Sequence, residues 1–455
     1  MVLSIKSNYF TETLTAQNIL KLFDFSLKIN GFSIDKALAA LSKIQAKNDS
    51  EFETYVRDQK KEILNYHLEY NSFYKSFGEI IDLNNWESVP VMTKHYLQIP
   101  LEQRLSDGFT NGNVYINKTS GSSGDPFIFA KDKWCHALTW AEIMNRFSWY
   151  GIDFNTSKQA RFYGIPLDKK DYYKECLKDW FSNRVRFSVF DLSDRAFKSA
   201  LNRFKTSKFD YINGYASAVV QFAKYLKQND IILKTICPSL KVCITTSEML
   251  FKDDKSLMEE QFGIPVINEY GASELDLIAF QNKENSWQIN SETLYVEILD
   301  ENDKVLPLGE EGRIVITSLY NKAHPFIRYD IGDIGVLSKG STIKKPILEK
   351  LVGRTNDIII LPSGKKAAGL TFYYITKSVI KNDGNVSEFS VEQLDISTFK
   401  ITYVSKQALS KAEIITITSE IERYLEHGIS LKFNRVEKLN RSKSGKLKQF
   451  ISHLT

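Results

Sequence analysis

The segment from Asn117 to Lys133, NKTSGSSGDPFIFAKDK, brings hydroxyl side chains and glycines together and ends with lysines. Hydroxyl groups, and the backbone amides that glycine leaves accessible, are groups that proteins use to surround phosphate. Lys131 or Lys133 could add positive charge. The segment is not a Walker A loop, because no Gly-Lys-Ser or Gly-Lys-Thr follows at the required spacing. It therefore indicates either a nucleotide-binding loop or a solvated turn between a strand and a helix.

Two later segments carry acids that suit metal or ribose binding. NEYGASEL, from Asn268 to Leu275, follows the apolar run IPVI, so a strand would deliver Glu274 to the carboxyl edge of a sheet, where α/β proteins bind ligands. Glu274 could bind Mg²⁺ through its carboxylate or simply cap a helix. RYDIGDIG contains Asp330 and Asp333, and an acid here could accept hydrogen bonds from both ribose hydroxyls or lie in a β-turn.

Two segments nearer the C-terminus are a candidate hinge and a basic loop. GRTNDIIILPSGKK begins at Gly353 and is interpreted as a hinge or as an ordinary hairpin. NRSKSGKLKQF, residues 440–450, is a basic loop that contains glycine, and it could equally be a solvated tail.

Composition limits the class of protein. The chain has 455 residues, 43% of them hydrophobic, which suffices for a large core and exceeds one ordinary domain. The net charge is only +5 and the basic residues are scattered, so no nucleic-acid partner is expected. Four cysteines without a CxxC pair, and six histidines without an HExxH motif, argue against a zinc site. The absence of a signal peptide or a long apolar run predicts a cytoplasmic protein without a membrane span.

The spacing of apolar residues predicts the elements that must position these segments. Residues 1–80 are predicted to be helical, because apolar positions recur every three or four residues. From 110 to 290, strand-like runs such as SLKVCITTSEM and IPVINEYG alternate with helical runs such as KWCHALTWAEIMNRFSWYG, which favours a mainly parallel sheet. Residues 293–345 alternate polar and apolar positions and predict a β subdomain.

The fold class predicted is therefore α/β, with a large N-terminal domain over residues 1–353. The last hundred residues mix strands (FSVEQL, TFKITYVS) with one helix (AEIITITSEIERYLEH) and predict a small, mobile α+β domain over residues 354–455.

The order and spacing of the segments are more specific than any one of them. TSGSSG, YGASE, RYDIGD, GRTND and SGK follow one another as in the adenylate-forming superfamily, which contains the acyl-coenzyme A synthetases, adenylation domains and luciferases. Within it the chain most resembles the phenylacetate–coenzyme A ligase and CapK-like branch, through NSFYKSFG, VPVMTKHYL, INGYASAVVQFAKYL and ITTSEML.

The resemblance implies an AMP-forming ligase. Such enzymes use ATP and Mg²⁺ to convert a small carboxylate into an acyl-adenylate, then transfer the acyl group to a thiol, often coenzyme A, or to an amine. CapK-like relatives tend to belong to polysaccharide pathways, where an amine or sugar could be the acceptor. An inactive nucleotide-binding scaffold is a further alternative.

The resemblance also implies roles for individual residues. Lys446 matches the catalytic lysine, Glu274 the metal ligand, and Asp333 the ribose-binding acid. Arg354 matches a second ribose or hinge contact. The other nucleotide-binding positions are Thr119, Ser120, Gly121, Ser122, Ser123, Gly124, Ser247, Glu248, Asn268, Glu269, Tyr270, Gly271 and Ser273. By position, the acyl pocket would be lined by Gly214, Tyr215 and Ser217.

The chain departs from the family pattern at two places. The usual Gly-Arg-x-Asp-Asp hinge is Gly-Arg-Thr-Asn-Asp here, so Asn356 or Asp357 could be the hinge residue. The usual Thr-Gly-Asp is Ile331-Gly332-Asp333, so a threonine contact is lost while the acid remains.

Overall fold

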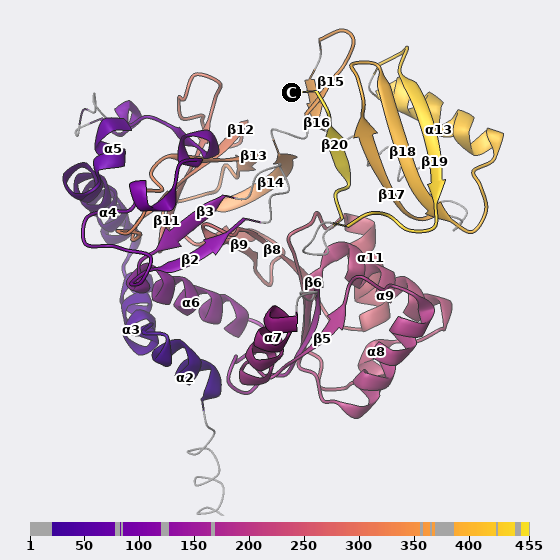
Figure 1. Cartoon of the computed structure of the whole chain (residues 1–455), viewed down its shortest axis with the longest axis horizontal. Helices are drawn as coiled ribbons and strands as arrows, with labels where there is room; N and C mark the ends of the chain where they lie inside the picture. Colours follow the sequence, from indigo (N-terminus) through magenta and orange to yellow (C-terminus); the bar gives the residue numbers. More distant parts are fainter. Residues whose placement is uncertain are drawn as a thin grey trace, which may run out of the picture.

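The computed structural model describes residues 21–77, 82, 85–119, 127–164, 169–354, 358–364, 366–368, 386–424, 426–441 and 447–454. They form a large N-terminal domain and a smaller C-terminal domain, which follows β14 and is drawn in orange to yellow (Figure 1).

Helices near the N-terminus cover one side of the large domain (Figure 1). Helix α4 begins at a capping box, since the Asn48 side chain accepts a hydrogen bond from the Glu51 amide and the Glu51 carboxylate accepts one from the Asn48 amide. Apolar residues of α2 and α3 pack against α6, as their helical spacing requires. The bounds are α2 (Leu22–Ile29), α3 (Ile34–Gln45), α4 (Asp49–Tyr70), α5 (Ser72–Phe77) and α6 (Lys133–Ser148).

Parallel strands form one half of a 12-stranded sheet, in the spatial order β5, β4, β6, β7, β8. One face of this half is apolar, with Phe162, Ile212 and Cys243 beneath α8, α9 and α11. On the other face, Val242 and Ile244 pack against α6. The strands are β4 (Gln159–Tyr163), β5 (Arg184–Ser188), β6 (Tyr211–Tyr215), β7 (Val242–Thr246) and β8 (Val266–Ala272). The helices are α7 (Lys169–Phe181), α8 (Asp194–Thr206), α9 (Ala216–Gln228), α10 (Leu233–Ile236) and α11 (Lys252–Phe262).

The other half of the sheet is antiparallel and runs from β8 through β9, β10, β14, β13 and β12 to β11, while β1 pairs parallel with β13. The bounds are β1 (Met92–Thr93), β9 (Asp276–Gln281), β10 (Trp287–Ile289), β11 (Leu294–Leu299), β12 (Glu311–Ser318), β13 (Tyr329–Leu337) and β14 (Ile347–Arg354). A separate antiparallel pair consists of β2 (Tyr115–Lys118) and β3 (Ile128–Lys131). Short 3-10 helices lie between α5 and β2: η1 (Trp86–Ser88), η2 (Lys94–Leu97) and η3 (Leu101–Gln103).

The C-terminal domain packs a four-stranded sheet, in the order β19, β18, β17, β20, against α13. Its core also receives Phe251 from the loop between β7 and α11, so the large domain contributes an apolar anchor to the small one. The bounds are β15 (Ile358–Ile360), β16 (Lys366–Ala368), β17 (Val386–Gln393), β18 (Thr398–Ser405), α13 (Lys411–Tyr424), β19 (Ser430–Val436) and β20 (Phe450–Ser452).

The structure confirms the predicted α/β class and most of the predicted elements. Two alternatives were wrong. RYDIGDIG is not a simple β-turn, because it lies in β13, and the loop of the first motif joins two strands, β2 and β3, before α6 begins. The hairpin interpretation of GRTNDIIILPSGKK is confirmed by the pairing of β15 with β16.

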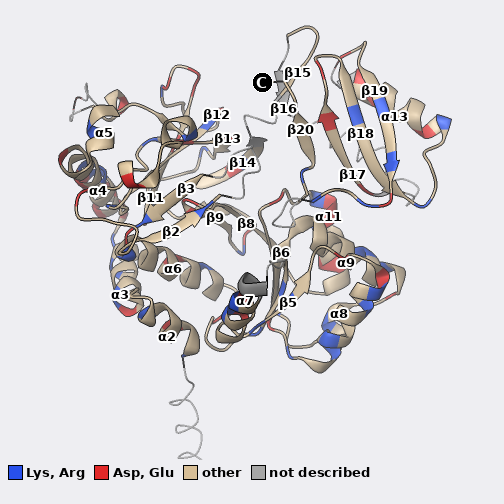
Figure 2. Cartoon of the chain, viewed as in Figure 1, with Lys and Arg blue, Asp and Glu red and all other residues tan. Residues whose placement is uncertain are grey.

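Lys and Arg are interspersed with Asp and Glu on elements of both domains (Figure 2). Among the described helices, none has the length and apolarity that a membrane crossing requires.

A buried histidine of α4 should make the stability of the large domain depend on pH. Burial lowers the pKa of His67 to about 4. The neutral ring donates from Nε2 to the Asn321 carbonyl oxygen (2.8 Å), and Nδ1 accepts from the Ser106 hydroxyl (3.2 Å). Between about pH 6.5 and 4 the unfolded chain therefore binds a proton at His67 that the folded chain does not bind. The free energy of unfolding keeps its full contribution from His67 above about pH 6.5. It falls by roughly 1 kcal/mol per pH unit between about pH 6.5 and 4.

Denaturant unfolding of the wild type and of His67→Gln across that range checks this expectation. The variant should show a shallower loss of stability on acidification, whereas His427→Gln, at an exposed position, should follow the wild type. Equal slopes for the wild type and His67→Gln would contradict the role of His67.

Candidate active site

Two buried acids, Glu274 and Asp333, are each hydrogen-bonded to a tyrosine on the other's segment, which links β8 with β13. The Tyr270 hydroxyl of β8 donates to Oδ2 of Asp333 on β13 (2.7 Å). The Tyr329 hydroxyl of β13 donates to Oε1 of Glu274, which follows β8 (3.0 Å). Glu274 and Asp333 are 6% and 7% exposed, so each carboxylate is held by a tyrosine at the rim of the sheet rather than left in solvent. The sequence predicted both residues as ligand-binding acids, and the fold brings their strands together.

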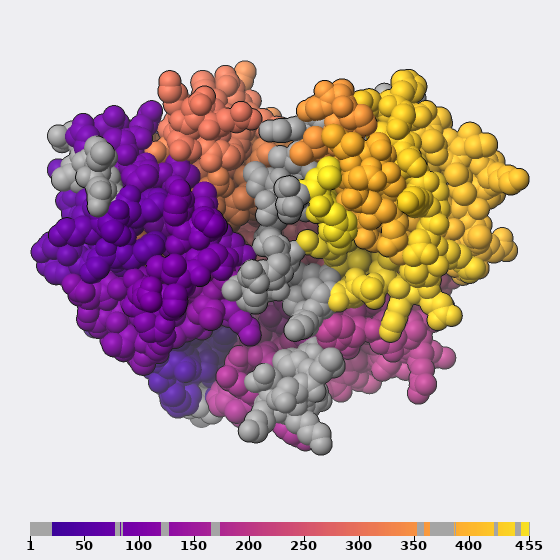
Figure 3. Space-filling model, turned by 45° about the horizontal axis from the view of Figure 1, so that its top comes forward, coloured from indigo at the N-terminus to yellow at the C-terminus, as the bar shows by residue number. Residues whose placement is uncertain are grey.

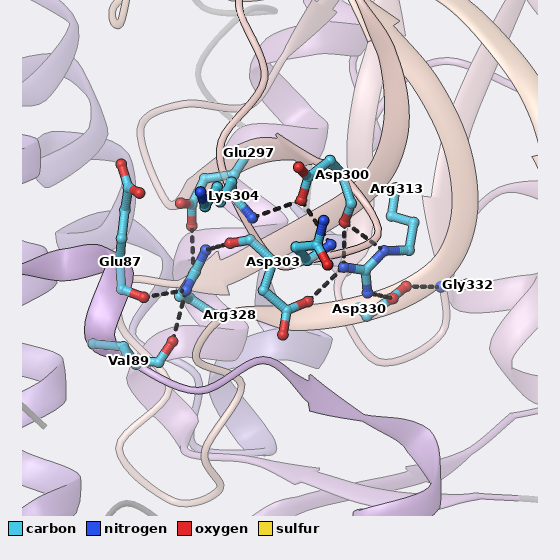
Figure 4. Close-up of polar contacts among 11 residues, drawn as sticks. Glu87, Val89, Glu297, Asp300, Asp303, Lys304, Arg313, Arg328, Asp330 and Gly332 are labelled. Atoms are coloured by element: carbon cyan, nitrogen blue, oxygen red, sulfur yellow. Dashed lines mark hydrogen bonds and ion pairs between the residues drawn. The ribbon is translucent and has the colours of Figure 1, made fainter. Parts of the chain in front are cut away.

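The structure also distinguishes Asp333 from Asp330, which the sequence could not. Arg313 of β12 donates from Nη1 to Oδ2 of Asp330 (2.8 Å), and Oδ1 of Asp330 accepts from the Gly332 amide (2.8 Å). Figure 4 shows Asp330 engaged in this way, beside the buried Arg328, which donates to the Val89 carbonyl oxygen (2.7 Å). Asp330 therefore has a structural role, and Asp333 remains the candidate for ligand binding.

A row of polar side chains crosses the carboxyl ends of the parallel strands. Strand register aligns Tyr215 with Thr246, and the alternation of side chains puts Tyr163 and Glu269 on the same face. The rings of Tyr163 and Tyr215 lie 4.5 Å apart between centroids. The Thr246 hydroxyl lies 3.4 Å from the Ser247 hydroxyl. Burial raises the pKa of the Glu269 carboxyl, so this row is polar but poorly hydrated.

The C-terminal domain is tied to this edge by a carboxylate. Glu248 follows β7, and it accepts hydrogen bonds from the Ser217 amide (2.7 Å) and from the Leu447 amide of the C-terminal domain (2.9 Å). Arg441 donates to the Ser217 hydroxyl (3.0 Å) and forms an ion pair with Glu388 of β17 (2.5 Å). Figure 3 shows the yellow domain lying directly against the magenta part of the large domain, in agreement with these contacts. Burial raises the pKa of Glu248.

Other predicted site residues lie around these contacts. Thr119 closes the base of the first loop, since its amide donates to the Phe127 carbonyl oxygen (2.9 Å) and its hydroxyl accepts from the Phe127 amide (3.0 Å). Ser247 is exposed in a left-handed conformation (φ 65°), which non-glycine residues adopt at a cost and often at functional sites. Asn268 is buried and accepts from the Thr245 hydroxyl (3.1 Å), and Ser273 is exposed.

Two predicted glycines are required by close packing. A Cβ on Gly271 would collide with the carbonyl oxygen of Asp276, and one on Gly214 would lie 2.6 Å from the Cβ of Phe162. Several predicted residues fall outside the part that the structure describes, or their side chains do: Ser120, Gly121, Ser122, Ser123, Gly124, Arg354, Asn356, Asp357 and Lys446.

Sequence reasoning missed Arg161, Tyr163 and Arg441. A detectable signal was the alternation in QARFY, where a charged residue occupies a position that a buried parallel strand normally fills with an apolar one. Arg441 had no comparable signal, because its partners lie in distant segments.

The residues present fit magnesium only in part. Glu274 offers the carboxylate oxygen that Tyr329 does not engage. Within the described ranges, no cluster of three or more His, Cys, Asp or Glu side chains could bind a metal alone. Mg²⁺ bound by one protein carboxylate together with phosphate oxygens is compatible with both facts.

The described residues also form a hollow of about 430 Å³ between α4, the start of α6 and the segment after β12. Three of its charged lining residues are engaged, since Lys322 pairs with Glu62 (2.8 Å) and Asp132 accepts from the Cys135 and Lys322 amides (both 2.8 Å). Of the residues that the sequence offered for ligand binding, it is lined by Lys133 alone.

Two known proteins illustrate what the sequence is similar to. No protein-family model matches the chain. Protein CapK of Staphylococcus aureus is 22% identical over 412 residues, covering 87% of this chain and 88% of CapK. Phenylacetate–coenzyme A ligase of Aromatoleum evansii is 31% identical over 131 residues, which cover 27% of this chain and 29% of that ligase.

Solved structures share the whole fold. 2-Hydroxyisobutyryl-CoA ligase in its postadenylation state superposes with a TM-score of 0.68 at 15% identity, over 89% of this chain and 90% of that one. The same ligase in its thioesterification state gives 0.53 at 14% identity over the same shares. Because coverage is unchanged, the higher score indicates that the domain arrangement here is closer to the postadenylation state.

The chain therefore shares the fold of 2-hydroxyisobutyryl-CoA ligase. Its sequence is similar to CapK and to the phenylacetate–coenzyme A ligases. Both similarities support the resemblance to the adenylate-forming superfamily that the sequence motifs indicate.

Proposed function

We propose that this protein activates a carboxylic acid with ATP, forming an acyl-adenylate and pyrophosphate, and then transfers the acyl group to a thiol such as coenzyme A or to an amine. The observation that best supports the proposal is the set of hydrogen bonds between the two domains. Residues 442–446 include Lys446, and both flanking residues, Arg441 and Leu447, contact the large domain at the carboxyl ends of its parallel strands. Such an arrangement suits a lysine that acts on ligands bound at that edge.

The large domain would bind the nucleotide. In this proposal Asp333 accepts the ribose hydroxyls, while Ser247, Asn268, Tyr270 and neighbouring residues surround the adenine. The loop from Thr119 to Gly124 would surround the β- and γ-phosphates through its amides and hydroxyls, which stabilises the departing pyrophosphate.

The reaction at the α-phosphorus would then need charge compensation. A carboxylate oxygen attacks that phosphorus and the bond to pyrophosphate breaks, so Lys446 would stabilise the charge that develops between the two reactants. Glu274 would hold Mg²⁺, which offsets phosphate charge when bound.

The second half-reaction would require the small domain to move about Asn356 or Asp357. The thiol or amine then attacks the acyl carbonyl, and AMP leaves.

Incubation with ATP, Mg²⁺ and a panel of carboxylic acids tests the proposal. Pyrophosphate should form only when a suitable acid is present, and AMP should be released in an equal amount once a thiol or amine acceptor such as coenzyme A is added. ADP and phosphate as the sole products would contradict it, as would ATP turnover that no acid stimulates.

A further inference from the structure

The face of the parallel half-sheet that looks away from α8, α9 and α11 is apolar where it packs against α6 but unusually charged at the β4–β5 edge. Parallel strands covered on both sides are normally apolar on both faces. Here β5 contributes Arg184 and Arg186, β4 contributes Arg161, and the row above them holds Tyr163 and Glu269. Removing a charged side chain from water costs free energy, so a charged residue on a covered face is expected to have a partner or a function.

Two of the three arginines are neutralised within the protein. Arg186 forms ion pairs with Asp179 (2.9 Å) and Glu175 (2.8 Å) of α7, and Arg184 lies 3.3 Å from Asp179. These arginine side chains are 9% and 17% exposed, which is typical of paired charges that support a fold.

Arg161 is different, because none of the described residues forms such an ion pair with it. Its guanidinium carbon lies 3.9 Å from the centroid of the Tyr163 ring, and its buried Nε forms no hydrogen bond. Among the residues that the structure describes, no carboxylate lies within ion-pair distance of the guanidinium. Glu269 is close enough to interact through space but does not contact it.

The stacking on Tyr163 determines where this free cation lies. Arg161 is one side-chain row below Tyr163 on the same face of β4, so stacking lifts the guanidinium toward the carboxyl edge of the sheet. Tyr163 in turn contacts Tyr215, one of the residues predicted to line the acyl pocket. The unpaired fork of Arg161 is therefore next to the place where the acyl chain would lie.

We infer that Arg161 is a specificity-determining residue, and that the acyl substrate carries an oxygen acceptor on its chain: a hydroxyl, a carbonyl or a second carboxylate. This inference rests on the proposed function. The planar guanidinium has several hydrogen-bond donors, and oxygen atoms on the acyl chain can accept from them. Beside a purely alkyl chain, these donors would have no acceptor. A site built to hydrogen-bond a substrate group rejects the analogue that lacks this group.

Acids of equal carbon skeleton test the assignment through kcat/KM for acid-dependent pyrophosphate release. One set is butyrate, 3-hydroxybutyrate and succinate, and the other is phenylacetate and 4-hydroxyphenylacetate. In at least one set, an oxygen-bearing acid should be preferred over its apolar analogue by about tenfold or more. Succinate against 3-hydroxybutyrate distinguishes an anionic acceptor from a neutral one.

Variants then ask whether Arg161 causes the preference. Arg161→Met keeps the length and apolar stem of the side chain, and it should abolish the preference, because the oxygen-bearing acid loses its hydrogen-bond donors while the apolar acid loses none. Arg161→Lys should keep part of it. Arg203→Met, on the exposed side of α8, is the matched control and should leave the preference intact.

The assignment would be overturned if the wild type preferred the apolar acids, or if a preference for oxygen-bearing acids survived in Arg161→Met. Pyrophosphate release would still support the proposed function in either case. Pyrophosphate release with none of the acids would count against both proposals.

Discussion

Lys446→Ala is expected to lower the rate of acyl-adenylate formation by at least about 100-fold, equivalent to roughly 2.7 kcal/mol of barrier. The reason is electrostatic: the ammonium group would act where carboxylate and α-phosphate charges approach, and a preorganised cation there has a large effect. ATP affinity should change much less, because the contact is needed mainly in the transition state. Single-turnover adenylation and calorimetric binding of ATP measure the two effects separately.

A nearby lysine provides the control for that experiment. Lys448 is exposed, two residues further along the same segment, and Lys448→Ala should adenylate within about twofold of the wild type. An adenylation rate in Lys446→Ala close to that of Lys448→Ala would refute the assignment of Lys446.

The part of the site that could be predicted from sequence is the part encoded by local signals. The apolar run before NEYGASEL predicts a strand, and a strand in a parallel sheet must end at the carboxyl edge, so the position of Glu274 followed from local pattern alone. Choosing between Asp330 and Asp333 required the neighbouring strand, because Arg313 of β12 is what engages Asp330. That pairing depends on the register of β12 with β13, which local pattern does not specify.

Contacts between segments that are distant in the chain could not be predicted from local sequence patterns. Glu248 and Leu447 are separated by 199 positions, and no periodicity links them. The sequence placed Glu248 in the adenine pocket by resemblance, and that role stays a prediction, while the structure shows its carboxylate bonded to Ser217 and Leu447. The free charge of Arg161 is similar, since it is recognised only when α7 is seen to neutralise the other arginines.

Glu248→Ala is expected to slow adenylation by about 10- to 100-fold. The carboxylate accepts both amides, and charge-assisted hydrogen bonds of this kind contribute about 1.5–3 kcal/mol each. Losing the bond to Leu447 would destabilise the docked position of the loop that contains Lys446, so a smaller fraction of molecules would be competent for adenylation. Glu248→Gln keeps one acceptor oxygen but puts an amide donor opposite one backbone donor, so its rate should fall between those of Glu248→Ala and the wild type.

The two half-reactions separate a positioning role from general damage to the fold. Glu248 is bonded to Leu447 in a domain arrangement closer to the postadenylation state than to the thioesterification state of the structural relative. Adenylation should therefore be impaired in Glu248→Ala, while acyl transfer from preformed acyl-adenylate to coenzyme A, or to whichever acceptor the protein uses, should stay within a few-fold of the wild type. Glu260→Ala, an exposed substitution on α11, should change neither rate. If Glu248→Ala slowed both half-reactions equally, or neither, the contact would be an ordinary structural bond, and Lys446 would reach the reaction without help from Glu248.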